Sequence, residues 1–442
     1  MSLPRYERYK DSGVEWLGEV PENWSVTKFR YCFFESAEKI EQEVVGPMLS
    51  VSGYRGIEIK EYDDDNRRRQ GDELVGYRVV RPGQLVVNTM WLNYAGLGIS
   101  PYEGHVSPAY RSYRVAETLH LRFAHHLMRS GSYIQGYTRL LTGIRPNSLQ
   151  MSRDDLMEFP IIVPPISDQS AIANFLDHET ARIDALIAEQ QRLIELLREK
   201  RQAVISHAVT KGLNPAAPMK PSGIEWLGDI PAHWAVHRLK AVSPEITVGI
   251  VVEPSRFYVE QGVPALRSLN VRPHAVTQEN LVFISPEGHA LNEKSRLNAG
   301  DLVAVRTGQP GTTGIVPAEL DGCNCIDLII IRQPRPGHGS GAYLCWFLNS
   351  DSAIRQFSEG SGGAIQQHFN VGTAMNLIIT VPPPDEQVII ATALSERTIK
   401  IDALTAEAQS AITLLQERRT ALISAAVTGK IDVRSVASPP LP

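Results

Sequence analysis

The residues whose spacing could support catalysis lie in one short stretch, Glu58-Ile-Lys60, with acidic residues following at positions 63–65. A carboxylate two positions before a lysine is typical of many nucleases, but such a triplet also arises often by chance. The matching place in the second half of the chain has nothing like it. The sequence also lacks an Asn-Pro-Pro-aromatic or Asp-Pro-Pro-aromatic motif, a glycine-rich methyl-donor loop, a Walker lysine and a His-Glu-x-x-His motif. We therefore expect no catalytic residue and no cofactor.

Cysteine usage indicates a reducing compartment and no metal site. The four cysteines are too few and too unevenly spread for a disulfide framework. Cys323 and Cys325 form a lone C-x-C without a second pair of ligands, which is more often structurally neutral than zinc-binding.

Size and charge bound the class of protein. With 442 residues and 43% hydrophobic residues, the chain is long enough for two or more domains with cores of their own. The formal net charge of -5 is not the basic excess expected of a small nucleic-acid binder, so any basic surface must be local. The N-terminus has no apolar signal region, and no run approaches the roughly 18 apolar residues of a membrane span. We expect a soluble, intracellular protein without a membrane partner.

Polar and aromatic residues that could contact DNA gather in short loops of both halves. Arg, Asn and Gln can bind base edges through two hydrogen bonds, and Trp and Tyr can stack on bases. Glycine-rich turns and ordinary surface loops have similar composition, so that alternative stays open. The candidates are Tyr54, Arg55, Thr89, Trp91, Asn93, Tyr94, Arg145, Asn147 and Ser148 in the first half, and Arg267, Asn270, Arg306, Thr307, Gln309, Gln366, Gln367, His368 and Asn370 in the second.

The elements that must position these loops occur twice along the chain. The segment Ser12–Trp24, SGVEWLGEVPENW, recurs 210 positions later at Ser222–Trp234 as SGIEWLGDIPAHW. The segment Val163–Gln169, VPPISDQ, recurs 218 positions later at Val381–Gln387 as VPPPDEQ. The chain is therefore a duplication, and the second copy carries a net insertion of eight residues inside its globular part.

Each copy divides at its Val-Pro-Pro. Prolines end a strand there and precede a helix, for which Asp168 and Asp385 are candidate N-caps. Before the prolines, each copy is expected to be a mixture of short strands and helices, with strands including Phe159–Val163 and Cys325–Arg332.

A long helix with a heptad pattern follows each Val-Pro-Pro. About 40 residues at 1.5 Å each span on the order of 60 Å, which favours a coiled coil over an ordinary amphipathic helix packed on its own domain. Because no third copy exists, each long helix is expected to pair with the other. Glu179, Gln190 and Lys200 interrupt the first pattern. The expected seam residues are Ile172, Leu176, Ile183, Leu186, Leu193, Leu197 and Val204, with Ile390, Leu394, Ile401, Leu404, Ala411, Leu415 and Leu422 in the second copy.

The repeated motifs resemble the specificity subunit of type I restriction-modification systems. The resemblance rests on Ser-Gly-(Val/Ile)-Glu-Trp-Leu-Gly at both repeat starts, Val-Pro-Pro before both helices and Ile-Asp-Ala-Leu within them. It spans about Tyr9 to Asp432. It implies an α+β fold in which two target recognition domains are separated by an antiparallel coiled coil with pseudo-two-fold symmetry.

By this resemblance, residues 1–164 and 214–382 are the two recognition domains, 165–213 and 383–432 are the spacer helices, and 433–442 form a tail. The family subunit is not an enzyme. It binds double-stranded DNA, docks two copies of a methyltransferase subunit and joins a translocating restriction subunit in the prokaryotic cytoplasm. A self-contained nuclease or methyltransferase and a scaffold that does not bind DNA are the alternatives. Because the loops of the two copies differ, the resemblance implies two different half-sites.

Overall fold

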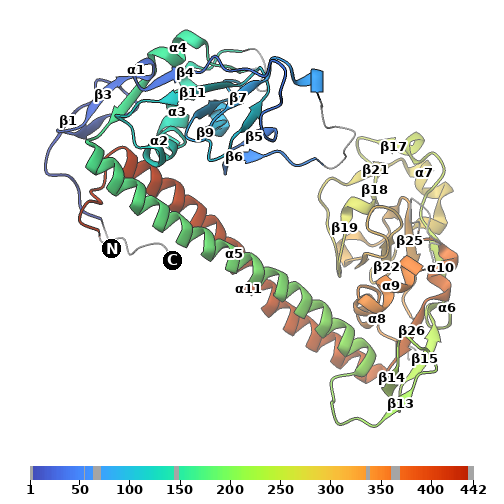
Figure 1. Ribbon diagram of the computed structural model, residues 1–442. Coiled ribbons are helices and arrows are strands. Elements are labelled where there is room, and N and C mark those ends of the chain that lie inside the picture. The colour runs from blue at the N-terminus through green and yellow to red at the C-terminus, as the bar shows by residue number, and fades with distance from the viewer. Residues whose placement is uncertain are drawn as a thin grey trace. The chain divides into compact units, whose positions relative to one another are not determined.

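The computed structural model describes residues 3–53, 55–62, 71–143, 149–334, 339–359 and 369–436. The chain forms two compact units: unit 1 comprises Met1–Gln191 and Ser410–Pro442, and unit 2 comprises Arg192–Gln409. Each unit contains a globular head of mixed strands and helices. Two long helices, α5 (Ile166–Lys211) and α11 (Pro384–Val427), each contribute residues to both units (Figure 1).

The head of unit 1 is assembled around a four-stranded antiparallel sheet with strand order β4-β11-β8-β9. Its helices are α1 (Phe29–Cys32), α2 (Leu121–Met128), α3 (Gly131–Leu140) and α4 (Arg153–Glu158), with 3-10 turns η2 (Gly71–Leu74) and η3 (Leu92–Tyr94). Its strands are β1 (Tyr9–Asp11), β2 (Glu19–Pro21), β3 (Ser25–Lys28), β4 (Phe33–Glu35), β5 (Leu49–Ser52), β6 (Gly56–Ile59), β7 (Arg78–Val80), β8 (Leu85–Val87), β9 (Leu97–Ile99), β10 (Gly104–Val106), β11 (Arg111–Val115) and β12 (Pro160–Val163).

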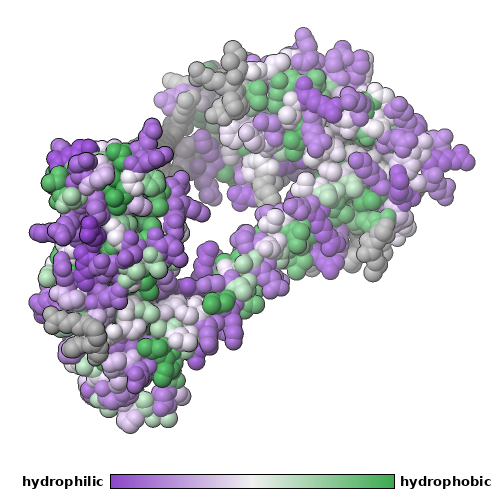
Figure 2. Space-filling model, turned by 180° about the vertical axis from the view of Figure 1, so that it is seen from behind, coloured by the Kyte–Doolittle hydropathy of each residue, from purple (hydrophilic) through white to green (hydrophobic). Residues whose placement is uncertain are grey.

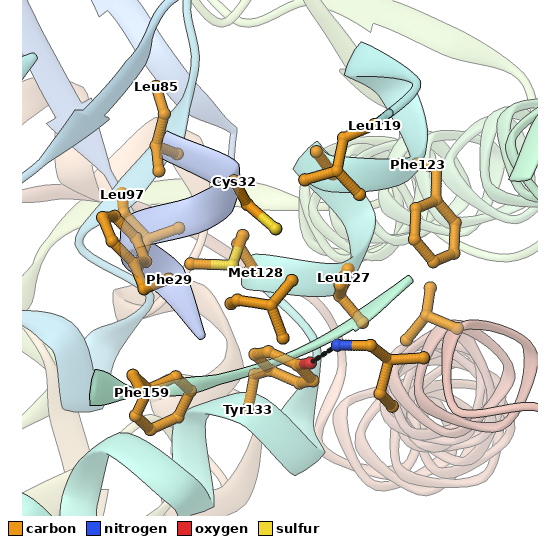
Figure 3. Packing of buried hydrophobic residues seen from close by; sticks show 14 of the residues in the cluster. Phe29, Cys32, Leu85, Leu97, Leu119, Phe123, Leu127, Met128, Tyr133 and Phe159 are labelled. Atoms are coloured by element: carbon orange, nitrogen blue, oxygen red, sulfur yellow. Dashed lines mark hydrogen bonds between the residues drawn. The ribbon is translucent and has the colours of Figure 1, made fainter. Parts of the chain in front are cut away.

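The core of this head is aromatic and links its sheet to its helices. Figure 3 shows Phe29, Tyr133 and Phe159 together with aliphatic residues of α2, all of them nearly or fully buried. The hydroxyl of Tyr133 on α3 accepts a hydrogen bond of 2.9 Å from the backbone N–H of Ile162 in β12. Burying a phenol requires such a partner, and this bond fixes α3 against the strand that leads into α5.

The head of unit 2 has a four-stranded sheet of the matching order, β16-β25-β22-β23, and a second four-stranded sheet, β17-β21-β18-β24. Its helices are α6 (Leu239–Val242), α7 (Pro286–Leu291), α8 (Gly341–Leu348), α9 (Asp351–Glu359) and α10 (Val371–Asn376), with 3-10 turns η5 (Pro254–Phe257), η6 (Ser268–Asn270), η7 (Glu293–Ser295) and η8 (Ala318–Leu320). Its strands are β13 (Met219–Pro221), β14 (Asp229–Pro231), β15 (Ala235–Arg238), β16 (Ile246–Val248), β17 (Tyr258–Val259), β18 (Val263–Leu266), β19 (Val271–Arg272), β20 (Ala275–Val276), β21 (Val282–Ile284), β22 (Leu302–Val305), β23 (Thr313–Ile315), β24 (Asn324–Cys325), β25 (Leu328–Ile331) and β26 (Ile378–Val381).

The repeated motifs make equivalent contacts in the two heads. The indole N–H of Trp24 donates to Asp168 at 3.3 Å, and that of Trp234 donates to Glu386 at 3.0 Å. The side-chain amides of Gln169 and Gln387 each donate to the carbonyl of the first proline before their helix, at 2.8 and 2.9 Å. These contacts explain why the tryptophan and glutamine recur at matching positions.

Asp168 does not cap its helix as the sequence predicted. The helices α5 and α11 begin at Ile166 and Pro384, so Asp168 and Asp385 lie in the first helical turn. A carboxylate in the first turn still favours the positive end of the helix dipole.

The sequence also predicted one continuous strand over Cys325–Arg332, whereas the structure has two strands there, β24 and β25. It breaks at Asp327, whose positive φ of 53° is incompatible with extended backbone.

The two long helices pair antiparallel within each unit. In unit 1, Arg419 Nε of α11 lies 2.9 Å from Asp184 Oδ1 of α5. In unit 2, Arg201 Nε of α5 lies 2.9 Å from Asp402 Oδ1 of α11. Both pairs are bidentate, with second contacts of 3.2 and 3.4 Å, and each residue of one pair is 218 positions from its counterpart in the other.

The buried seam differs from the predicted one at Leu186, Leu193 and Leu404, which are exposed by 38%, 42% and 50%. Ile187 and Ile194 are buried in place of the first two, and Thr405 after Leu404 is half-buried. The buried neighbours are Ile187, Ile194, Ile412 and Ala408, with Thr180 and Thr398 at matching buried places; of the other predicted residues, Ile172, Leu176, Ile183, Leu197, Ile390, Leu394 and Ile401 are buried, and Val204, Ala411, Leu415 and Leu422 are half-buried.

The end of each long helix completes the core of the head that belongs to the other copy. Ile423, Ala426 and Val427 of α11 are part of the unit 1 core. Ile205, Ala208 and Val209 of α5 are part of the unit 2 core. Matching serines reinforce this packing: Ser424 accepts a hydrogen bond from the N–H of Gly131, and Ser206 accepts one from the N–H of Asp351.

No helix among the described ranges is both long enough and apolar enough to cross a membrane.

Candidate functional site

The loop between β8 and β9 of unit 1 presents two exposed aromatic side chains. Trp91 and Tyr94 are 55% and 59% exposed, and their rings meet edge to face with centroids 6.0 Å apart. Leu92 between them is fully buried and fixes the loop to the core. Exposed aromatic rings are costly in water and are suited to stacking on a flat partner. The structure therefore places two of the predicted contact residues side by side on the surface.

The backbone of this loop is tightly folded. Ala95 has a φ of 54°, a left-handed conformation that residues other than glycine rarely adopt. A Cβ atom on Gly96 would lie 2.6 Å from the carbonyl oxygen of Trp91, so only glycine fits there. This shape turns the side chains of Trp91 and Tyr94 outward.

A second predicted loop, between β5 and β6, lies against the first. A Cβ atom on Gly53 would be 2.5 Å from the carbonyl oxygen of Tyr94, so the two backbones are in close approach. The guanidinium of Arg55 is largely exposed and lies 2.5 Å from Glu58. The predicted residue Tyr54 falls outside the described residues.

The third predicted loop begins and ends close to the first. Thr142 and Gln150 pair as a β-bridge, and the N–H of Met151 donates to the carbonyl of Thr89 at 3.1 Å. Thr89 itself is half-buried. Arg145, Asn147 and Ser148 lie outside the described residues.

Asn93 lies between the two exposed rings with an unused acceptor. Its Oδ1 atom is buried and has no hydrogen-bond partner among the described residues. A buried polar atom without a partner is uncommon and costs free energy.

Arg129 joins the first two loops and was not singled out from the sequence. It caps the C-terminus of α2, and among the described residues its guanidinium donates to four backbone carbonyls, those of Leu97 (2.6 Å), Gly53 (2.8 Å), Ala95 (3.0 Å) and Ser52 (3.2 Å). Burial, and secondarily the positive charge of Arg419, lowers the pKa of Arg129 to about 10. No local sequence pattern marks Arg129, because its acceptors lie 32 to 77 positions away in the chain.

The equivalent loop of unit 2 lies between β22 and β23 and has other residues. Gln309 in this loop is exposed, and Thr307 is half-buried. Arg306 forms an ion pair with Asp327, and it exchanges hydrogen bonds with the backbone of Phe369 at 3.1 and 3.4 Å. Arg306 is thus held by contacts within its own head.

Asn270 and Arg267 differ from the expectation for DNA contacts. Asn270 is fully buried: its Oδ1 accepts from the N–H of Arg267 at 2.9 Å, and its Nδ2 donates to the carbonyl of Glu279 at 2.8 Å. The guanidinium of Arg267 donates to the carbonyl of Asn280 at 2.9 Å. The Asn270 amide is therefore used to shape its own loop. The sequence does not reveal this, because the residues next to an asparagine in the chain do not show whether its side chain is buried in its own loop or exposed.

Asn370 is exposed and caps α10, accepting from the N–H of Thr373 at 2.9 Å. Gln366, Gln367 and His368 lie outside the described residues.

Asn349 takes the place of Arg129 in unit 2. It caps α8 as Arg129 caps α2, and each is followed by a serine at the start of the next helix. Its Oδ1 accepts from the N–H of Thr313 at 3.1 Å, and its Nδ2 donates to the carbonyl of the same residue at 2.9 Å. Thr313 is the first residue of β23, directly after the loop. Each head therefore has a residue at this position that holds the loop, and we call Arg129 and Asn349 the loop anchors.

The residues considered for catalysis and metal binding have other surroundings. Glu58 pairs with Arg55, and residues 63–65 fall outside the described residues. Burial raises the pKa of the Cys323 thiol to about 12. No group of three or more His, Cys, Asp or Glu side chains in the described part of the chain is placed to hold a metal ion.

Two heads of one sheet topology, each completed by paired long helices, define the class of fold found in solved specificity subunits of restriction systems. A chain solved in work on complex assembly and conformational transition of the type I R-M system has a TM-score of 0.70 over 92% of this chain and 98% of its own, at 16% identity. The HsdS subunit from Thermoanaerobacter tengcongensis has a TM-score of 0.53 over 93% and 98%, also at 16% identity. The α+β fold predicted from the sequence is confirmed.

The sequence comparisons point to the same class. The chain is 28% identical over 186 residues to the type I restriction enzyme EcoKI specificity subunit of Escherichia coli, covering 42% of this chain and 37% of that protein. It is 27% identical over 285 residues to the MjaVIII specificity subunit of Methanocaldococcus jannaschii, covering 62% and 63%. The matched regions thus span less than two thirds of the length of these relatives. No family model matches the chain. The chain is a relative of type I restriction enzyme specificity subunits, as its repeated motifs predicted.

Proposed function

We propose that this chain is the DNA-reading specificity subunit of a type I restriction-modification complex. Each head reads one half of a bipartite target, and the paired helices set the distance between the halves. The recognition domains are residues 1–164 and 214–382, the spacer helices are 165–213 and 383–432, and residues 433–442 form a tail.

One observation carries this proposal: the two heads hold different exposed loops at one place in the same framework. Trp91 lies in the loop that follows β8, and Gln309 lies in the loop that follows β22, the equivalent strand of the other head. Trp91 offers an aromatic face for stacking or methyl contacts, whereas Gln309 offers an amide that suits adenine. Different side chains on a shared framework are expected if each head reads a different sequence.

The long helices supply the proposed ruler. α5 has 46 residues and α11 has 44, so at 1.5 Å each they span on the order of 65 Å. Half-sites separated by at least one helical turn, about 34 Å, are within that reach. The Arg201–Asp402 and Asp184–Arg419 pairs stabilise one register of the helices.

The proposed partners are double-stranded DNA, two methyltransferase subunits and a translocating restriction subunit. Hydrophobic patches lie among hydrophilic residues on the surface of the paired helices (Figure 2). Leu196 and Leu414, which are 218 positions apart, are 45% and 65% exposed. Matching exposed leucines suit two copies of one partner, because each copy would meet the same residues. The methyltransferase partners would provide the chemistry, and this chain would provide none.

Genome-wide sequencing of methyladenine in cells with and without the gene tests this proposal. We expect one bipartite methyladenine motif to disappear with the gene. Persistence of every motif would contradict the proposal. DNA cleavage or methylation by the purified chain alone, with magnesium or S-adenosylmethionine, would instead favour an enzyme.

A further inference from the structure

Arg129 has an unusual environment for an arginine. Its side chain is half-buried, and no carboxylate among the described residues pairs with its guanidinium; the four acceptors are backbone carbonyls. A buried charge is normally paired with an opposite charge, since its removal from water costs several kcal/mol. A chain keeps such a group only where the hydrogen bonds replace hydration and where its geometry serves a purpose.

The four carbonyls belong to two separate loops. Ser52 and Gly53 lie in the loop after β5, and Ala95 and Leu97 lie in the loop before and at the start of β9. The fork of the guanidinium can donate in several directions from one plane, which a lysine ammonium cannot do with fixed geometry. Arg129 therefore sets the position of the two loops relative to each other.

These hydrogen bonds also determine which way the loops face. With the carbonyls of Gly53 and Ala95 directed inward to the guanidinium, the adjoining side chains of Arg55 and Tyr94 are directed to solvent. The left-handed backbone at Ala95 is one of the strained points that such contacts must maintain.

A cavity borders the two loops on their inner side. It has a volume of about 530 Å³ and lies between them and the long helices, lined by Gly53, Ala95, Arg129, Asp184 and Arg419 among others. Leu92 packs the middle of the loop between β8 and β9 into the core, whereas Gly53 and Ala95 line the cavity, and their carbonyls accept hydrogen bonds from Arg129.

We propose that Arg129 is a specificity-determining positioning residue, which holds the Arg55 loop and the Trp91–Tyr94 loop in the one arrangement that reads the half-site of the first head. It does not contact DNA itself. The inference rests on the proposed DNA-reading function and deepens it. In the second head, Asn349 does the corresponding work with a neutral amide that holds a single strand at Thr313. The two heads thus differ in the anchor as well as in the loop.

The test selects DNA from a random-sequence library with the full-length chain, as wild type, Arg129→Lys or Arg122→Lys. Arg122 is the matched control: it lies on the same helix, but it contacts Asp177 and Asn174 on α5 rather than a loop. We expect wild type and Arg122→Lys to enrich both half-sites. We expect Arg129→Lys to keep the second half-site and to lose at least about tenfold in preference for the first, because one well-placed base contact is of that size.

Hydrogen exchange on the same samples separates positioning from stability. In Arg129→Lys, amides of residues 89–97 should exchange faster while those of β8 and β11 stay protected. Arg129→Ala should behave in the same way, and methylguanidinium, which can enter the cavity, should restore the first half-site.

Unchanged selectivity and exchange in Arg129→Lys would overturn the inference. Equal loss of both half-sites, or faster exchange throughout the head, would also overturn it by showing a general structural role. If the wild-type chain selects no sequence, the proposed function fails instead, and the exchange of residues 89–97 still decides whether Arg129 holds the loops.

Discussion

The loops and the framework of this duplicated chain have diverged to different extents. Trp24 and Trp234 donate to carboxylates at matching helix positions, and Ser424 and Ser206 accept from matching backbone N–H groups. The loop after β8, in contrast, presents Trp91 and Tyr94, whereas the equivalent loop after β22 presents Gln309. Framework residues must satisfy buried polar groups and fill a core, so few alternatives are tolerated. Exposed loop residues have no such constraint, which leaves them free to match a partner.

Substitutions at the ends of the long helices test this comparison first, because each end packs into the core of one head. Val427 and Val209 are both fully buried and are 218 positions apart. Val427→Asp should destabilise unit 1 by more than about 4 kcal/mol, since it buries an unpaired carboxylate. Val209→Asp should destabilise unit 2 to a similar degree. Hydrogen exchange resolved by residue is the measurement. Equal destabilisation of both heads by either variant would show that the heads are not independently supported.

Acid should act on each head through a different histidine: His125 in unit 1, and His274 in unit 2, whose pKa burial lowers to about 4. Burial, and secondarily the charge of Arg129, lowers the pKa of His125 to about 3, whereas the corresponding residue of the second copy is Cys345, whose thiol pKa burial raises to about 12. Unfolded histidine titrates near 6.5. The stabilising effect of neutral His125 is fully present above that pH and is lost as the pH falls toward 3, because only the unfolded chain takes up the proton.

We therefore expect unit 1 to lose about 1.4 kcal/mol of unfolding free energy per pH unit from this group between pH 6 and pH 4. Denaturant unfolding across this range should show a shallower slope for His125→Gln. His207→Gln, at an exposed position of α5, is the control substitution. A slope in His125→Gln that equals the wild-type slope would refute this assignment.

The exposed loop residues should alter recognition without altering stability. Trp91→Ala should weaken binding to the first half-site about tenfold, and Gln309→Ala should weaken binding only to the second by a similar or smaller factor. Both side chains are exposed, so the unfolding free energy should change by less than about 0.5 kcal/mol. Binding assays with one half-site scrambled at a time measure this. Loss at both half-sites from one substitution would contradict the separation of the two readers.

Much of the framework could be predicted because its signals are local. The Val-Pro-Pro before each long helix and the heptad repeat that follows it are conformational or periodic patterns in consecutive residues. The seam shows the limit of this reasoning. Leu186 and Ile187 are both apolar, so spacing alone did not decide which is buried; the antiparallel partner decides for Ile187.

The candidate site was less predictable, since its arrangement depends on contacts distant in sequence. Trp91 and Tyr94 were found by residue type because they are exposed and aromatic. Arg129 was missed because its acceptors lie 32 to 77 positions away. Asn270 was predicted as a DNA contact, but its amide is buried against carbonyls that spacing does not reveal.

In this account the loops recognise the half-site sequences and the long helices set the gap between the half-sites. Shortening only the helices tests this division most directly. Deletion of residues 188–194 and 406–412 removes one heptad from each helix and keeps the seam in phase. Methyladenine sequencing of cells carrying this variant should recover the same two half-sites, with a gap shortened by about three base pairs, since a heptad spans about 10 Å. An unchanged gap, or half-sites with altered sequences, would contradict the account.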